Sequence, residues 1–115
     1  MAFGIIVSAL LLAQAAPAEG SEAAYEQLAA GENAGAIARL EAALEETPGD
    51  PALLINLGTA YARAGRMNEA RAAFREAIAS EDRYRVELAD GSWEDSRKVA
   101  RLALESLDRT ALAAK

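Results

Sequence analysis

The chain of 115 residues contains no cysteine and no histidine. Their absence removes disulfides, thiolate nucleophiles, imidazole bases and the usual zinc ligands from the chemistry available to the protein. Aromatic residues make up only 5% of the chain. Valine, isoleucine and threonine are scarce after the first dozen residues, which argues against an extensive β-sheet. We therefore expect an all-α protein without a metal site or cofactor.

Positive charge is also scarce in one part of the chain. The formal net charge is −6, and residues 19–50 carry eight acidic side chains against one basic side chain. Residues 51–115 are nearly balanced, with ten acidic and eleven basic side chains interleaved. Nucleic acid requires a clustered positive surface, so this distribution excludes it as the expected partner.

A run of apolar residues opens the chain, from Phe3 to Ala13. This run is shorter than the roughly 20 residues that span a bilayer. Two small-x-small motifs follow, Ala13–Ala15 and Ala16–Ala18, so residues 1–18 are predicted to be a signal peptide cleaved after Ala15 or Ala18. The protein would then be periplasmic or secreted. An uncleaved segment that anchors the protein in the membrane, or packs on its own core, stays open as an alternative.

Two copies of one pattern lie 34 residues apart in the rest of the chain. Shifting Gly31, Ala36, Leu40 and Ala43 by this period gives Gly65, Ala70, Phe74 and Ala77. Such a period is typical of stacked helical hairpins. Apolar spacing and the breaks between segments predict helices at about residues 21–30, 34–46, 51–64 and 67–80. Asp50 is expected to cap the third of these, with Pro51 in its first position.

The pattern resembles the tetratricopeptide repeat family, and in particular its small exported bacterial members. The second copy matches the family at Leu57, Gly58, Tyr61, Ala70, Phe74 and Ala77, with Leu54 in place of the tryptophan and Asp82 in place of the final proline. The first copy matches at Ala36, Ala43 and Pro48, whereas Leu40, Ala24 and Gln27 depart from it. The resemblance implies two repeats within residues 19–82, a degenerate one at about 17–50 and a clear one at about 51–84.

Residues 83–115 do not repeat and are expected to form a connector and a C-terminal capping helix. Tyr84–Leu88 alternates apolar and charged side chains, and Asp90–Gly91 is a turn signal. A short hairpin at about 84–94 would place Trp93 across from Leu88 as an anchor. An extended connector with a capping box from Ser92 to Asp95 is the alternative. The last helix should run to Ala113, with these residues inward: Val99, Leu102, Ala103, Leu107 and, less centrally, Leu104.

No catalytic constellation is present, because the neighbouring carboxylates Glu45–Glu46 and Glu81–Asp82 lack a second partner cluster. We therefore predict that the protein is not an enzyme and has no small-molecule substrate.

By resemblance, it is expected to be an adaptor that binds a partner protein or peptide on the concave face of the repeats. A self-associating structural module that forms homo-oligomers in the cell envelope is the alternative. In the clear repeat the residues implied to face the groove are Ala52, Ile55, Asn56, Thr59 and Arg63. In the degenerate repeat they are Ala18, Ser21, Glu22, Tyr25 and Ala29. Asn56 could donate a hydrogen bond to a peptide carbonyl.

Overall fold

The computed structural model describes residues 21–88 and 90–113. The predicted signal segment, residues 1–18, lies outside this part. The described elements are the helices α2 (Ser21–Ala29), α3 (Asn33–Glu46), α4 (Pro51–Arg63), α5 (Met67–Ala79) and α6 (Ser96–Ala113), with the strands β1 (Arg85–Glu87) and β2 (Trp93–Asp95). The predicted all-α class with a short hairpin before the last helix is confirmed.

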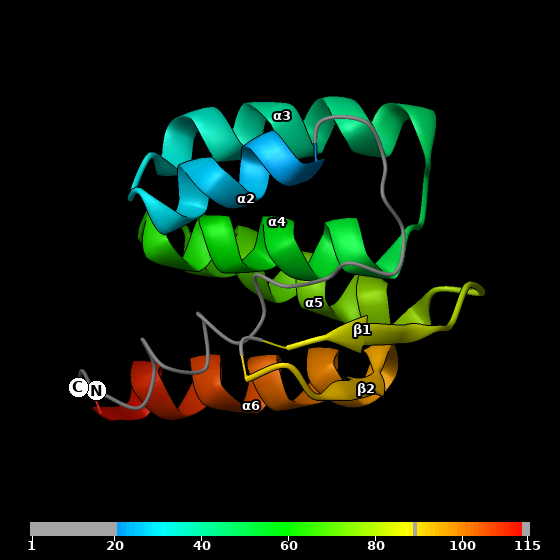
Figure 1. Cartoon of the computed structure of the whole chain (residues 1–115). Coiled ribbons are helices and arrows are strands. Elements are labelled where there is room, and N and C mark those ends of the chain that lie inside the picture. The colour runs from blue at the N-terminus through cyan, green and yellow to red at the C-terminus, as the bar shows by residue number, and fades with distance from the viewer. Residues whose placement is uncertain (1–20, 89, 114–115) are drawn as a thin grey trace.

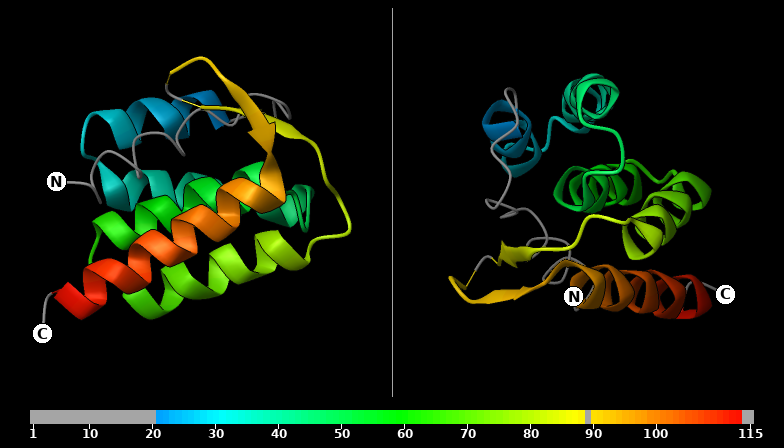
Figure 2. Two further views of the ribbon diagram at one scale, coloured as in Figure 1. Left: turned by 90° about the horizontal axis from the view of Figure 1, so that it is seen from below. Right: turned by 90° about the vertical axis from the view of Figure 1, so that its right-hand side faces the viewer.

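Helix α4 is the centre of the structure. In Figure 1 the α2–α3 hairpin lies above α4, and α6 lies below it with the two strands. The end-on view in Figure 2 shows α2, α3, α5 and α6 grouped around α4, and α4 contacts each of them. Every residue from Pro51 to Ala62 is consequently buried.

The 34-residue period appears in the backbone hydrogen bonds at the two helix ends. Gly31 N donates to Leu28 O at 3.1 Å, and Glu32 N donates to Gln27 O at 2.8 Å. One period later, Gly65 N donates to Ala62 O at 3.1 Å and Arg66 N to Tyr61 O at 2.8 Å. Both glycines have positive φ, 82° and 79°. This is the Schellman arrangement, in which glycine avoids the strain of a left-handed residue.

Asp50 caps α4 as predicted. Its Oδ1 accepts hydrogen bonds from Ala52 N at 2.9 Å and from Leu53 N at 3.2 Å, and Pro51 occupies the first turn. The same oxygen accepts from the Tyr84 hydroxyl, which also accepts from Ala52 N at 3.2 Å. Tyr84 therefore fastens the tail to the start of α4.

Gly58 sets the approach of α4 to α5. A Cβ atom added at Gly58 would lie 2.5, 2.7 and 2.9 Å from three carbons of the Phe74 ring. Real Cβ contacts do not come so close, and both residues lie in the tightly packed interior. The Phe74 ring therefore occupies the volume that any larger residue at 58 would need.

The hairpin forms with a register different from the one predicted. Glu87 pairs with Trp93 and Val86 pairs with Glu94, whereas Leu88 N bonds Ser92 O. Successive side chains on a strand point to opposite faces, and buried Val86 points to the core. Trp93 lies across from Glu87 on the other face and is 43% exposed, so its predicted role as the anchor was wrong.

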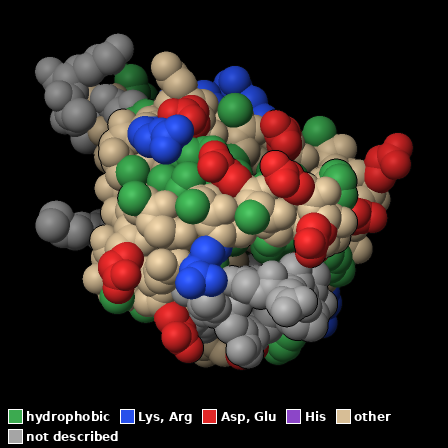
Figure 3. Space-filling view, turned by 90° about the horizontal axis from the view of Figure 1, so that it is seen from above, with side chains coloured by type: hydrophobic (Ala, Val, Ile, Leu, Met, Phe, Trp, Pro, Cys, Tyr) green, Lys and Arg blue, Asp and Glu red, His purple; other side chains and the backbone are tan. Residues whose placement is uncertain are grey.

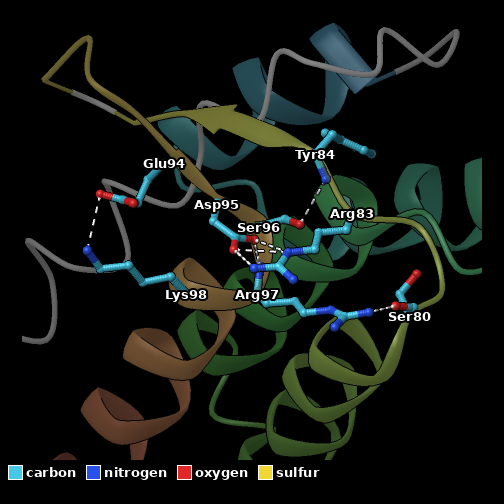
Figure 4. A network of polar contacts seen from close by, with 8 residues as sticks. All are labelled: Ser80, Arg83, Tyr84, Glu94, Asp95, Ser96, Arg97 and Lys98. Carbon is cyan, nitrogen blue, oxygen red and sulfur yellow. Dashed lines mark hydrogen bonds and ion pairs between the residues drawn. The ribbon is translucent and has the colours of Figure 1, made fainter.

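A polar network joins the hairpin to the helices on either side (Figure 4). Arg83 donates to both oxygens of Asp95, which in turn accepts from Arg97 N at 2.9 Å and so caps α6. These bonds hold the pKa of the Asp95 carboxyl below its ordinary value, the Arg83 guanidinium contributing most. Arg97 Nη2 reaches back to Ser80 O at 2.9 Å. Residues 83–97 are thus held to one another and to the C-terminal end of α5.

Helix α6 packs on the repeats through Val99, Ala103 and Leu107, as predicted, and Leu104 is half-buried. Leu102 was expected to face inward as well, but it is 45% exposed. The buried residues follow each other at helical spacing. Leu102 precedes Ala103 by one residue, about 100° around the helix, and therefore points away from the core.

Replacing Gly58 with alanine should destabilise the fold by about 1–3 kcal/mol, the usual cost of overpacking a core. Urea unfolding measures the change. Gly35→Ala is the matched control, because an added Cβ there meets only the flexible end of Gln27. That variant should be neutral or gain up to about 1 kcal/mol from helix propensity. Equal effects at both positions would contradict the role given to Phe74.

Candidate functional site

The residues predicted to line the concave face lie mostly inside the structure. Ala52, Ile55, Asn56 and Thr59 are all buried, with Asn56 4% exposed. Tyr25 lies in α2, but its side chain is outside the described part, as are those of Ser21 and Glu22. Ala29 is exposed, and Ala18 precedes the described residues. The structure therefore brings four of the predicted residues together on α4 without exposing them, and their binding role stays a prediction.

Arg63 links the two repeats. Its Nη1 donates to Leu28 O, the carbonyl near the end of α2, at 2.6 Å. Burial lowers the pKa of the Arg63 guanidinium from its ordinary value. A cation is favourable at a helix C-terminus, where unpaired carbonyls carry partial negative charge. Arg63 thus contributes to packing between α4 and α2 in this structure.

Asn56 differs from its neighbour Thr59 on α4 in its hydrogen bonding. The Thr59 hydroxyl donates to Ile55 O at 3.0 Å, as is common for threonine within a helix. The Asn56 Oδ1 atom, in contrast, is buried and accepts no hydrogen bond in the structure. A buried acceptor left without a donor costs about 1–3 kcal/mol. Gln27 Oε1, Asn33 Oδ1 and Arg97 Nε are in the same state. Asn56 is the one of these four residues that was predicted to face the groove.

A pocket of about 210 Å³ opens on the other side of α4, between α3 and α5. Its apolar lining comes from these residues: Leu44, Leu54, Leu57, Tyr61, Ala72 and Ala73. Glu69 and Glu76, both exposed on α5, line it as well. An enclosed apolar cavity of about 150 Å³ is large enough to hold benzene. The pocket can therefore accept one branched or aromatic side chain.

Charged side chains surround Tyr61 at one side of this pocket. Its hydroxyl donates to Glu41 Oε2 at 2.5 Å, and the Arg66 guanidinium carbon lies 4.7 Å from the centre of its ring. Arg66 also pairs with Glu69. Burial, followed by the hydrogen bond to Glu41, raises the pKa of Tyr61 to about 12. The side of the pocket near Tyr61 thus carries two carboxylates, those of Glu41 and Glu69, and one guanidinium, that of Arg66.

Acidic side chains dominate the surface of α2 and α3. Viewed from above this layer, Figure 3 shows hydrophobic side chains lying among acidic ones. The exposed charged residues described on these helices and their connection are Glu26, Glu32, Glu41, Glu45, Glu46 and the one cation Arg39. The pocket was not predicted as a site from the sequence. Spacing offers a signal: Glu41 and Glu45, and Glu69 and Glu76, recur beside the apolar stripes of α3 and α5.

Within residues 21–88 and 90–113 there is no group of three or more histidine, cysteine, aspartate or glutamate residues that could hold a metal ion. None of the helices in this part of the chain combines the length and the apolarity needed to cross a membrane.

Paired antiparallel helices, a shared turn geometry and a 34-residue period define a helical-repeat protein. The family model for the tetratricopeptide repeat matches residues 27–90, more than half of the chain. The chain belongs to the tetratricopeptide repeat family. Repeats of this family form protein–protein interaction modules and are generally non-catalytic. No curated protein and no solved structure matches the chain.

The raised pKa of Tyr61 predicts a loss of stability in alkali. Folding favours the neutral phenol, so the stabilisation is complete below pH 10 and is lost as the pH rises from 10 to about 12. Urea unfolding across this window should show a smaller loss for Tyr61→Phe than for the wild type. Burial and the bond to Asp50 also raise the pKa of Tyr84. Tyr84→Phe should therefore also lose less stability in alkali than the wild type. Equal losses in all three proteins would contradict the assignment.

Proposed function

We propose that this protein is a non-enzymatic adaptor of the bacterial cell envelope that binds a partner protein or peptide on the concave face of its repeats. Membership of the tetratricopeptide repeat family supports the general class. The observation that carries the location is the unpaired Oδ1 atom of Asn56, on the face of α4 predicted to meet a partner.

Asn56 suits the recognition of a peptide backbone. Its carboxamide can accept a hydrogen bond through Oδ1 and donate through Nδ2. A partner N–H that reaches Oδ1 would supply the missing donor and remove the cost of the unpaired acceptor. Because Asn56 is buried, binding through it requires a rearrangement that exposes its carboxamide. A substantial minority of protein complexes show loop or domain rearrangements on binding.

Replacing Asn56 with leucine, which has a similar shape, separates binding from stability. The variant should be as stable as the wild type or more stable by on the order of 1 kcal/mol, because it removes the unpaired acceptor. It should also recover less of the partner that the wild type captures from a cell-envelope extract. Quantitative mass spectrometry of the captured proteins and urea unfolding give the two readouts.

Asn68→Leu is the matched control, since Asn68 is exposed on α5 and should leave capture unchanged. An Asn56/Arg63 double variant tests the same face more severely. The proposed function fails if the wild type captures nothing above background, and the proposed location fails if Asn56→Leu captures as much as the wild type.

Self-association in the cell envelope is the second candidate function. The observation that favours it is an exposed leucine on the outer face of α6, Leu102, whose side chain is 45% exposed. Stacked repeats end in a surface that can contact another copy, and a contact between two different surfaces generates rings or filaments. Light scattering at rising protein concentration decides this candidate, because a strict monomer excludes it.

Export by a cleaved signal peptide is part of the proposal, with membrane anchoring by the uncleaved segment as its alternative. Support comes from the apolar run Phe3–Ala13 and the small residues that follow it. The first residue of the mature protein should be Ala16 or Glu19. N-terminal sequencing and intact mass of the protein recovered from its producing cells test this, and a chain that keeps residues 1–18 overturns cleavage.

A further inference from the structure

Two surfaces of this chain remain without a function: the pocket between α3, α4 and α5, and the outer face of α6. We propose that they bind each other between copies, so that Leu102 of one copy enters the pocket of the next. This inference rests on the second candidate function, self-association, and specifies its interface. It does not involve the concave face.

The pocket fits one leucine side chain. Its volume of about 210 Å³ and its apolar lining match an aliphatic group. The lining is preformed, because Leu54, Leu57 and Tyr61 come from α4, which is held on several sides by other helices. A preformed site loses little conformational entropy when it is filled. The occupant must therefore offer a protruding apolar side chain on a rigid element.

The outer face of α6 offers such a side chain. Lys98, Leu102, Glu105 and Arg109 recur at helical spacing and form one exposed stripe. Arg101 is exposed beside it. The opposite face of α6 packs on the repeats, which fixes the orientation of Leu102. Leu102 thus projects from a well-held helix, and around it lie the cations Lys98, Arg101 and Arg109 and the carboxylate of Glu105.

Charge favours a contact between the pocket and the outer face of α6 over a contact between two pockets or between two α6 faces. Glu69 and Glu76 of α5 line the pocket. Glu41 and Glu45 lie on α3, and the guanidinium of Arg66 comes from the residue just before α5. The other arginines of α5, Arg71 and Arg75, do not line the pocket. Glu45 and Glu76 have no hydrogen bond or ion pair with any described residue. Arg101 and Arg109 on α6 are likewise without such a partner, whereas Lys98 pairs with Glu94 at 3.4 Å.

Two pockets facing each other would bring carboxylates together, and two α6 faces would bring together surfaces that each carry three cations and one carboxylate. Like charges across an interface are unfavourable, while opposite charges steer the encounter and fix its register. The favoured contact therefore joins different surfaces of two copies. Since each copy keeps one pocket and one α6 face, such a contact forms a ring or an open chain.

The test is the association of the purified mature protein, measured by sedimentation velocity and light scattering over rising concentration. Leu102→Glu should weaken association about tenfold or more, because it places a carboxylate in an apolar, acidic pocket. Glu76→Arg should also weaken it and should reduce its sensitivity to salt. Leu112→Glu, elsewhere on α6, and Glu46→Arg, outside the pocket lining, are the matched controls and should associate as the wild type does. All four sites are exposed, so thermal unfolding should show that the variants remain folded.

Mixing the two defective variants gives the sharper result. Leu102→Glu keeps an intact pocket, and Glu76→Arg keeps an intact α6 face. Together they should form a one-to-one dimer that grows no further, because only one intact interface can form between them. A strict monomer for the wild type overturns both the inference and self-association. Association that survives both variants overturns the inference alone. Neither outcome affects capture of a partner through Asn56, so failure of the adaptor function is seen separately.

Discussion

The close contact between Gly58 and the Phe74 ring is the constraint on which the rest of the structure depends. It lets α5 approach α4 without a gap, and the other helices then complete the enclosure of α4. Enclosure explains why a helix of mostly small and aliphatic residues is buried along its length. It also fixes the lining of the pocket, because Leu54, Leu57 and Tyr61 come from this one helix.

Much of the fold could be predicted from the sequence because the repeat is a pattern of local rules. Asp50 and Pro51 begin α4, and Gly31 and Gly65 follow the ends of α2 and α4. The need for a small residue at Gly58 likewise belongs to the repeat and does not depend on the tail. These signals determined the helix boundaries to within a few residues. The hairpin was harder. Its register depends on which strand residue reaches the core, and Val86 rather than Trp93 does so.

The predicted binding face shows where a family pattern stops being informative. The resemblance assigned Ala52, Ile55, Asn56 and Thr59 to an open groove, whereas the structure buries them. Whether a helix face is open depends on what packs over it, and this cannot be read from the helix itself. The unpaired oxygen of Asn56 could not be predicted either, since it depends on the absence of a donor nearby in three dimensions.

A short repeat stack has more exposed surface for each buried residue than a long one, because both of its ends are open. This chain covers one end with a hairpin and α6, fastened by Tyr84 to Asp50 and by Arg83 to Asp95. The helix that covers this end, α6, has an outer face of its own, and Leu102 is exposed to solvent on that face. The exposed leucine is therefore a direct consequence of ending the stack. The pocket on the preceding helices has a suitable volume for it, and the carboxylates of Glu69 and Glu76 complement the cations around it.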